Sequence, residues 1–320
     1  MVYLSRPGTA DPQHAVSASV LADLLQRAHP GHPDAGALSA TAARIRDHQR
    51  RYVAPPASEG LAGADPDAEV ALGEQAARAA LDAARLKAGD IGGFITISSA
   101  GEALCLRLIQ ALQLPSTVSY VPLADEGASG GLQALATAGD LARRGPVLIV
   151  QTSSGCAPEV PLARRLLRAD GATAVVVRTD PPGPGEVALE VRDFWSWTES
   201  ADAADVGGGA SREFARPDEA ADAVRTAIGR APWLHRAHPG FALVHPGGPR
   251  YLDAVGEALD GIDLDGCRAV LASEGDTGSC AVLRVLARLF QEPPAPDSDG
   301  FLLGVAPEHS AACRAVWRRG

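Results

Sequence analysis

Residues 241–289 read FALVHPGGPRYLDAVGEALDGIDLDGCRAVLASEGDTGSCAVLRVLARL, the most informative stretch of the chain for the fold class. Its continuous apolar runs at 241–245 and 268–273 predict buried strands, while the runs at 250–259 and 279–290 predict helices. Glycine-rich turns join each strand to the helix that follows it. Buried strands that alternate with helices are typical of an α/β protein whose sheet is covered on both faces.

The same alternation continues in both directions along the chain. Toward the N-terminus it predicts three helices and four buried strands, at 67–88, 103–114 and 132–145 for the helices and at 93–99, 118–123, 146–154 and 171–180 for the strands. Around the quoted stretch it predicts a further helix and two further strands, at 218–230, 300–306 and 313–317.

A connection rich in Gly, Pro and Asp, residues 180–215, separates two stretches with the same rhythm. We therefore expect two similar halves, residues 1–180 and 181–320. The first 66 residues are broken repeatedly by Pro and Gly, which predicts packed loops and short helices there.

Composition excludes several classes of function. The 320 residues carry 29 Lys and Arg against 39 Asp and Glu, a net charge of −10, so nucleic acid is not an expected partner. The five cysteines form no CxxC pair, which disfavours a zinc site or a disulfide framework, and we expect no metal. No apolar run approaches the roughly 18 residues of a membrane span, and the N-terminus has no signal pattern, which predicts a cytoplasmic protein without membrane contact.

Three turns combine a preceding strand, glycines, polar residues and a following helix: residues 125–131 (DEGASGG), 245–249 (HPGGP) and 273–279 (SEGDTGS). Such a turn lies at the carboxyl end of its strand and beside a helix N-terminus, where backbone N–H groups stabilise negative charge. This position suits a nucleophile or an oxyanion hole. Each turn by itself is weak evidence, because glycine-rich strand-to-helix turns are common in proteins without any catalytic role.

Taken together, the three turns resemble those of the type III polyketide synthases (the chalcone synthase family) and their ketosynthase III relatives. Residues 241–289 resemble the segment that carries the family's His and Asn, and RADGATAVVV at 168–177 resembles its FGDGAAA strand entry. The likeness extends over about residues 4 to 305. It implies an α/β fold of the thiolase type, a five-layered αβαβα sandwich of two similar halves, and a homodimer.

The resemblance places the family's three catalytic residues on Ala128, His245 and Asp276. His245 is unchanged, but Ala128 stands where the family has its nucleophilic Cys, and Asp276 where it has Asn. A methyl group cannot attack a thioester, so this chain cannot form an acyl intermediate at position 128. Either Ala128 is a substitution introduced into a protein with Cys, or the natural protein lacks the nucleophile. The tight turn and the apolar helix after it favour the first explanation.

Asp276 changes the chemistry that can be expected of His245. An Asn donates a hydrogen bond to the enolate oxygen of a condensing enzyme, whereas an ionised Asp cannot donate and repels that anion. Beside His245 it would orient the imidazole and stabilise its protonated form, as in hydrolases with a Ser-His-Asp triad. This arrangement suits the deprotonation of a hydroxyl or an amine. The simpler interpretation, in which Asp276 only caps the next helix, is equally open.

Further residues are expected to contact substrate. Thr152, Ser153 and Cys156 lie at or just after the end of a buried strand, where the family lines its acyl site. The catalytic turns add Gly247, Gly248 and Thr277. Lys is scarce in the chain, so Arg side chains are the expected contacts for phosphopantetheine, with Arg50, Arg51 and Arg212 as mere candidates.

The leading functional hypothesis is an acyltransferase of natural-product biosynthesis. It would move an acyl group from CoA or an acyl carrier protein, through a Cys at 128, to a hydroxyl, an amine or a malonyl-derived carbon. No cofactor beyond the thioester substrate is expected. Two alternatives remain open: a cyclase, dehydratase or decarboxylase that uses His245 and Asp276 without a nucleophile, and a catalytically silent partner subunit of a ketosynthase.

Overall fold

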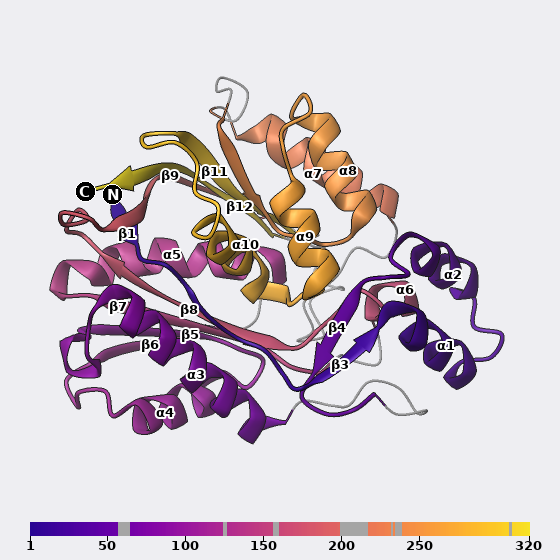
Figure 1. Cartoon of the computed structure of the whole chain (residues 1–320), viewed down its shortest axis with the longest axis horizontal. Coiled ribbons are helices and arrows are strands. Elements are labelled where there is room, and N and C mark those ends of the chain that lie inside the picture. Colours follow the sequence, from indigo (N-terminus) through magenta and orange to yellow (C-terminus); the bar gives the residue numbers. More distant parts are fainter. Residues whose placement is uncertain are drawn as a thin grey trace.

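A computed structural model describes residues 1–56, 65–123, 127–155, 160–198, 217–231, 233, 239–306 and 309–320. These residues form five layers, which Figure 1 shows nearly edge-on. Helices α3 and α4 form one outer layer, followed by a sheet layer, the central helices α5 and α10, a second sheet layer, and an outer layer of α7, α8 and α9. The expected thiolase-type αβαβα sandwich is therefore confirmed.

The first sheet layer and its helices come from the N-terminal part of the chain. In chain order the elements are β1 (Val2–Leu4), β2 (Gly8–Ala10), α3 (Pro66–Ala84), η1 (Ala88–Asp90), β5 (Gly93–Ile97), α4 (Gly101–Leu112), β6 (Ser119–Leu123), η2 (Gly127–Ser129), α5 (Gly130–Leu141), η3 (Ala142–Arg144), β7 (Val147–Ser153) and β8 (Gly171–Arg178), where η marks a 3₁₀ helix. The strands predicted at 93–99, 118–123, 146–154 and 171–180 and the three predicted helices are all confirmed, within a few residues at their ends.

The second sheet layer and its helices follow in the chain. The elements are β9 (Val187–Thr198), α7 (Pro217–Arg230), β10 (Phe241–Val244), α8 (Pro249–Ala258), α9 (Asp265–Ser273), η4 (Gly278–Cys280), α10 (Ala281–Leu289), β11 (Asp299–Val305) and β12 (His309–Arg319). Two predictions fail here. Residues 268–273 belong to helix α9, not to a strand, and part of the supposed connection at 180–215 is the long strand β9.

The failure at 268–273 has a physical cause. Its short apolar run is one face of an amphipathic helix, in which Cys267, Val270 and Leu271 are buried at spacings of three and four residues. A run of this length cannot be assigned to a strand or a helix from periodicity alone. The neighbouring elements favour the helix here, because α9 packs beside α8 in the outer helix layer and also contacts α10 of the central layer.

Both layers belong to one hydrogen-bonded sheet of ten strands with the order β10-β11-β12-β9-β1-β8-β7-β5-β6, in which β2 also pairs with β8. Apart from β6 and β2, the order is symmetric about the antiparallel contact of β1 with β9. On one side β5 and β7 are parallel and β7 and β8 antiparallel; on the other, β10 and β11 are parallel and β11 and β12 antiparallel. The two halves thus repeat one topology, while the boundary near residue 180 stays a prediction.

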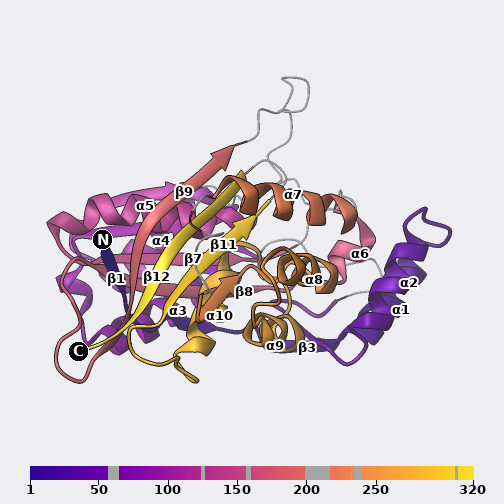
Figure 2. The same ribbon diagram turned by 90° about the horizontal axis from the view of Figure 1, so that it is seen from above.

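The predicted irregular segment contains more regular structure than its Pro and Gly content indicates. It forms β3 (His14–Ser17), α1 (Ala18–Ala28), α2 (Ala35–Arg44) and β4 (Gln49–Tyr52), and β3 pairs with β4 in a separate sheet. The later helix α6 (Leu162–Arg165) packs against α2 through a small apolar core. Figure 2 shows α1 and α2 at one end of the molecule, far from the two termini.

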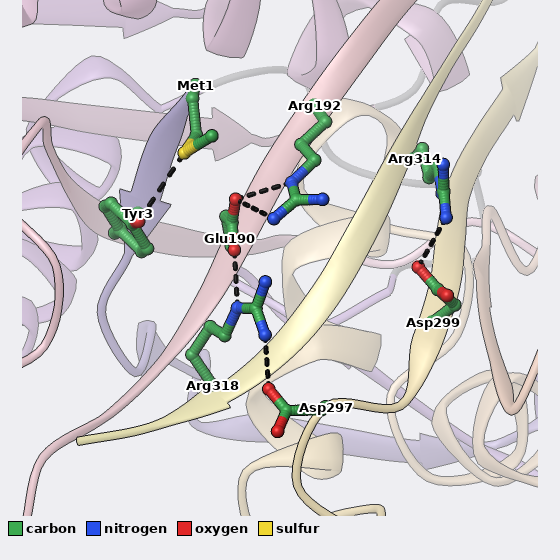
Figure 3. Close-up of polar contacts among 8 residues, drawn as sticks. All are labelled: Met1, Tyr3, Glu190, Arg192, Asp297, Asp299, Arg314 and Arg318. Carbon is green, nitrogen blue, oxygen red and sulfur yellow. Dashed lines mark hydrogen bonds and ion pairs between the residues drawn. The ribbon is translucent and has the colours of Figure 1, made fainter.

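Charged side chains link the strands of the second sheet layer (Figure 3). Glu190 on β9 is 1% exposed and accepts hydrogen bonds from Arg192 and Arg318, and Arg318 also binds Asp297. Burial raises the pKa of Glu190, but the two arginines outweigh it and leave that pKa below the ordinary value.

Among the described residues, no helix combines the length and the apolar character that crossing a membrane requires.

Candidate active site

Ala128 lies in the 3₁₀ turn η2, between β6 and helix α5, and is 7% exposed. Gly127 before it has φ +63°, a conformation that glycine adopts without strain, and this residue lets the chain turn sharply into the helix. Ser129 occupies the N-cap position of α5, but its side chain makes no capping hydrogen bond. The turn therefore presents position 128 beside the N-terminus of a buried helix, as the sequence predicts.

His245 directly follows strand β10 and is 4% exposed. Its backbone N–H donates to the carbonyl of Leu303 on β11, over 3.0 Å, and its ring lies edge-on to Tyr251, with centroids 6.1 Å apart. A Cβ at Gly247 would lie 3.0 Å from the His245 ring carbon Cδ2, so the glycine leaves room for the imidazole. The Gly-Gly turn thus shapes the space around the ring.

His245 and Asp276 meet in the interior. The ring nitrogen Nε2 lies 3.3 Å from the Asp276 carboxylate oxygen Oδ1, and both side chains are at most 5% exposed. The same oxygen accepts a hydrogen bond of 3.0 Å from the backbone N–H of Gly278. One oxygen of Asp276 therefore fixes the turn before α10 and contacts His245. Asp276 is not the N-cap residue of the next helix, because Thr277 and Cys280 occupy the N-cap positions of η4 and α10.

The environment of Asp276 favours its ionised form. Burial acts to raise its pKa, but the contact with His245, together with the charges of Arg168 and Arg164, outweighs burial and holds the pKa of Asp276 well below its usual range. An ionised carboxylate can only accept hydrogen bonds. Nε2 of His245 must then carry the hydrogen, and in the neutral ring Nδ1 is the acceptor. Nδ1 is buried and has no hydrogen-bond partner among the described residues.

Strand β11 brings Ala128 and His245 to the same place. Leu303 accepts the backbone hydrogen bond of His245, and the next residue, Gly304, packs against Ala128. The turns η2 and η4 are also in contact, and η4 follows Asp276. The three turns singled out in the sequence are thus neighbours in the fold, although Asp125 and Glu126 of the first turn lie outside the described residues.

The expected substrate contacts are distributed over two faces of the sheet. Adjacent strand residues point to opposite faces. Ser153 faces η4, since its Oγ lies 3.5 Å from the Cβ position of Gly278, whereas Thr152 faces α3, with Oγ1 3.5 Å from Glu69 Oε2. Thr277 is 0% exposed, and its hydroxyl has no hydrogen-bond partner in the described part of the chain.

Some of the arginines and cysteines expected to contact substrate lie among the described residues, and others lie outside them. Cys156 and Arg212 lie outside the described residues, so the structure does not place them. Arg50 is fully buried and donates to three backbone carbonyls, those of Gln49, Leu166 and Leu271, so it holds loops together and is not an accessible contact for phosphopantetheine. The described cysteines, Cys105, Cys267, Cys280 and Cys313, are all buried.

The segment 162–170 is a part of the site that sequence reasoning missed. Leu167 accepts from the backbone N–H of Asp276 over 2.8 Å, and Ala169 donates to the Asp276 carbonyl over 2.9 Å. Arg164 donates to the carbonyl of Gly247, and its Nη2 lies 3.9 Å from Asp276 Oδ2. The run PLARRLLRAD carried a signal in its clustered arginines, but nothing in the sequence indicates that they reach the other two turns.

Two buried carboxylates lie on the α3 side of the sheet, and they too were not predicted. Glu69 accepts hydrogen bonds from the hydroxyls of Ser98 and Ser154. Asp170 accepts from the backbone N–H groups of Val53 and Gly155, each over 2.9 Å. Burial raises the pKa of Asp170 to about 6, against the opposing effect of these two hydrogen bonds.

Solved structures with this fold are known. Germicidin synthase from Streptomyces coelicolor, a type III polyketide synthase, superimposes with a TM-score of 0.81 over 99% of each chain, at 24% identity. The tetrahydroxynaphthalene synthase of the same organism, described as a bacterial type III polyketide synthase, also gives a TM-score of 0.81 and 24% identity, over 99% of this chain and 100% of that one. At this identity the likeness establishes the fold alone.

Sequence relatives carry the assignment further, although no protein-family model matches the chain. The 1,3,6,8-tetrahydroxynaphthalene synthase of Streptomyces coelicolor is 27% identical over 100% of this chain and 95% of its own length. The synthase of the same name from Streptomyces peucetius subsp. caesius is 30% identical over 74% of this chain and 70% of its own length. These relatives are polyketide synthases and not simple acyltransferases, which narrows the functional hypothesis. Together with the shared fold, they show that this chain belongs to the type III polyketide synthase family.

Proposed function

We propose that this chain catalyses carbon–carbon bond formation in natural-product biosynthesis, cyclising a polyketide-type thioester with His245 as the acid–base group and without an acyl-enzyme intermediate. The observation that carries the proposal is the buried contact of 3.3 Å between His245 Nε2 and Asp276 Oδ1. The chain belongs to a family of polyketide-forming enzymes, yet Ala128 stands at the position that the resemblance assigns to the family's nucleophile.

The chemistry follows from the hydrogen-bonding roles of the pair. Ionised Asp276 accepts from Nε2, so the Nδ1 lone pair of His245 can take a proton from a carbon flanked by two carbonyl groups. The enolate then attacks the thioester carbonyl of the same substrate. One C–C bond forms, one C–S bond breaks, and the thiolate that leaves takes the proton back from the imidazolium. The reaction needs no cofactor beyond the thioester substrate.

A second candidate function is the covalent route, acyl transfer through a Cys at position 128. The retained turn supports it, because Gly127, with φ +63°, still delivers position 128 to the N-terminus of α5. A helix N-terminus lowers the pKa of a thiol placed there. On this route the printed chain is an inactive form of a polyketide synthase.

One experiment separates the two routes. The parent chain, Ala128→Cys and His245→Gln are incubated with acetyl- and malonyl-CoA, which test the covalent route, and with a 3,5,7-trioxo acyl thioester of CoA or of an acyl carrier protein, which is long enough to cyclise. Intact-mass spectrometry reports acyl adducts, and chromatography with mass detection reports products and released thiol. Turnover by the parent chain that disappears in His245→Gln supports the cyclase. Turnover and adducts found in Ala128→Cys alone refute the cyclase and support the covalent route.

We also propose an acyl-CoA substrate and a homodimer, with the acyl carrier protein as the alternative donor in the same assay. Strand β6 supports the dimer, because it ends the sheet order and is half-exposed, with Tyr120 42% exposed. Such an edge offers backbone groups to a second chain. Multi-angle light scattering of the purified chain tests this. A monomer that dimerises only with a ketosynthase would instead support the silent-partner hypothesis.

A further inference from the structure

We propose that Arg164 is a positioning residue that fixes the His245 turn relative to the Asp276 turn and thereby holds the imidazole in a single tautomer. The inference rests on the proposed function, in which His245 is the acid–base group. It concerns helix α6, which the comparison with the family's motifs does not include.

The side chain of Arg164 reaches both catalytic turns. Its Nη1 donates to the carbonyl of Gly247, two residues after His245, and its Nη2 lies 3.9 Å from Asp276 Oδ2. The side chain is 17% exposed, so both contacts lie mostly out of water. A guanidinium is planar and carries five N–H donors in a rigid fork, so one arginine can hold two acceptors at a fixed separation.

The two oxygens of Asp276 face different partners. Oδ1 takes the ring nitrogen of His245 and the backbone N–H of Gly278, and Oδ2 faces Arg164. A carboxylate that is held on both sides cannot turn its Oδ1 away from the ring without losing contact on the other side. The ring in turn keeps its hydrogen on Nε2, because only that tautomer donates to Oδ1.

The chain segment that carries Arg164 is itself bonded to the Asp276 turn. The backbone of Leu167 and Ala169 forms two hydrogen bonds with Asp276, and Tyr52 donates from its hydroxyl to the carbonyl of Arg168 over 2.8 Å. The segment from α6 to β8 is therefore fixed against the Asp276 turn before the side chain is considered. Arg164 adds the connection from this segment to the His245 turn.

Arg168 is the natural comparison, because it also stabilises the charge of Asp276. A Cβ at Gly278 would lie 2.9 Å from its Nη1, which places Arg168 beside the Asp276 turn. Among the described contacts, however, the link to the Gly247 carbonyl belongs to Arg164.

The test uses the full-length chain labelled with ¹⁵N in its histidine rings. His245→Gln identifies the His245 signals, and Arg164→Gln, Arg164→Lys and the control Arg165→Gln are compared with the parent. Arg165 is the next residue of α6, and it contacts the carbonyl of Val160 and Nε2 of His29. The ¹⁵N shifts of a neutral ring distinguish the two tautomers, and this readout needs no substrate.

We expect the parent to show the tautomer with hydrogen on Nε2. In Arg164→Gln the two ring signals should move toward each other, because the tautomers exchange. The signals of Arg164→Lys should lie between those of the parent and of Arg164→Gln, because lysine keeps the charge but can hold one acceptor only. Arg165→Gln should match the parent. Parent-like signals in Arg164→Gln, or equal changes in Arg165→Gln, would overturn the proposal. If Arg164→Gln does not fold, parent-like signals in Arg164→Lys and Arg165→Gln alike overturn it.

Kinetics give a second readout where the parent turns over a thioester. A reacting group displaced by about 1 Å loses on the order of a hundredfold in rate. Arg164→Gln should therefore lower kcat by about that factor with little change in KM, and Arg164→Lys should recover part of it. An unchanged kcat would count against the positioning role. Absence of turnover in the parent refutes the proposed function but leaves the tautomer test intact, so the two failures are distinguishable.

Discussion

Gly304 packs directly on the backbone of Ala128: a Cβ built on Gly304 would lie 2.1 Å from the Ala128 carbonyl oxygen. Real Cβ atoms do not approach a carbonyl oxygen so closely, so any larger residue must push η2 away from β11. The position of the turn η2, which carries Ala128, therefore depends on the glycine at position 304 of strand β11.

We expect Gly304→Ala to destabilise the protein by about 3 kcal/mol, the upper end for overpacking, because backbone and not a flexible side chain must move. Urea unfolding followed by circular dichroism measures it. Gly36→Ala is the control: its Cβ meets nothing within 4 Å and it lies in α2, so the protein should gain up to about 1 kcal/mol. Equal effects of the two substitutions would contradict the packing argument.

Asp276→Asn should lower the turnover of the parent chain by about a hundredfold or more. The amide is neutral and can present either its oxygen or its N–H₂ group to the ring, so Nε2 is no longer held as the donor. Steady-state kinetics with the thioester that the parent accepts provide the measurement. A rate within a factor of about three of the parent would show that the ionised carboxylate does not matter.

The double variant Ala128→Cys/Asp276→Asn should decarboxylate malonyl groups, unlike either single variant. It combines a thiol with an amide that can donate a hydrogen bond to the enolate oxygen, which an ionised Asp cannot do. Release of carbon dioxide from malonyl-CoA is the readout. Decarboxylation at the same rate in Ala128→Cys alone would refute the role assigned to Asp276.

Asp170 should make stability fall as the pH rises from about 4 to 7. Burial raises its pKa from 3.8 to about 6, so the folded protein binds a proton in this range that the unfolded chain has released. Folding is therefore favoured below the unfolded pKa of 3.8, and this contribution is lost as the pH passes about 6. The difference of roughly two pKa units corresponds to about 3 kcal/mol.

The substitution Asp170→Asn removes this titration, so its unfolding free energy should depend less on pH between 4 and 7 than that of the parent. The difference between the two curves isolates Asp170 from the other titrating groups. A constant offset between the curves, with no change in slope, would mean that Asp170 does not titrate in this range.

Glu190→Gln should destabilise the fold by about 3 kcal/mol, because it leaves Arg192 and Arg318 without the buried carboxylate that both contact (Figure 3). The control is Asp299→Asn, which removes the ion pair between Asp299 and Arg314. The side chains of Arg314 and Asp299 are 39% and 46% exposed. An exposed pair contributes at most about 1 kcal/mol. Thermal or denaturant unfolding measures the loss of stability in both variants. Equal losses would refute the distinction between the buried and the exposed ion pair.

The sequence alone predicts most elements of the fold, and the exceptions have local causes. Strand β9 lacks the continuous apolar run of a buried strand, because polar residues interrupt it and its second half is largely exposed. Helix α9 cannot be told from a strand by periodicity, because its apolar run is only a few residues long. The conformations of β9 and α9 are fixed by the elements that pack against them.

The candidate site divides in the same way. Ala128, His245 and Asp276 stand out in the sequence because each lies in a glycine-rich turn after a strand or near a helix N-terminus. Arg164 has no such signal: it is one of two arginines in a short helix, and its contacts join residues 83 and 112 positions away, at Gly247 and Asp276. Periodicity and local propensity carry no information about a contact over such a separation.

By itself, the sequence determined the alternation of strands and helices, the three turns and the residue types in them, because these depend on local periodicity and on glycine. It also determined that position 128 carries no nucleophile, since an alanine side chain has none in any fold. Only the tertiary structure decided that one oxygen of Asp276 serves both the Gly278 turn and His245, and that Arg164 reaches both turns. Such contacts arise from the packing of segments distant in the chain, and packing fixes them where local sequence cannot.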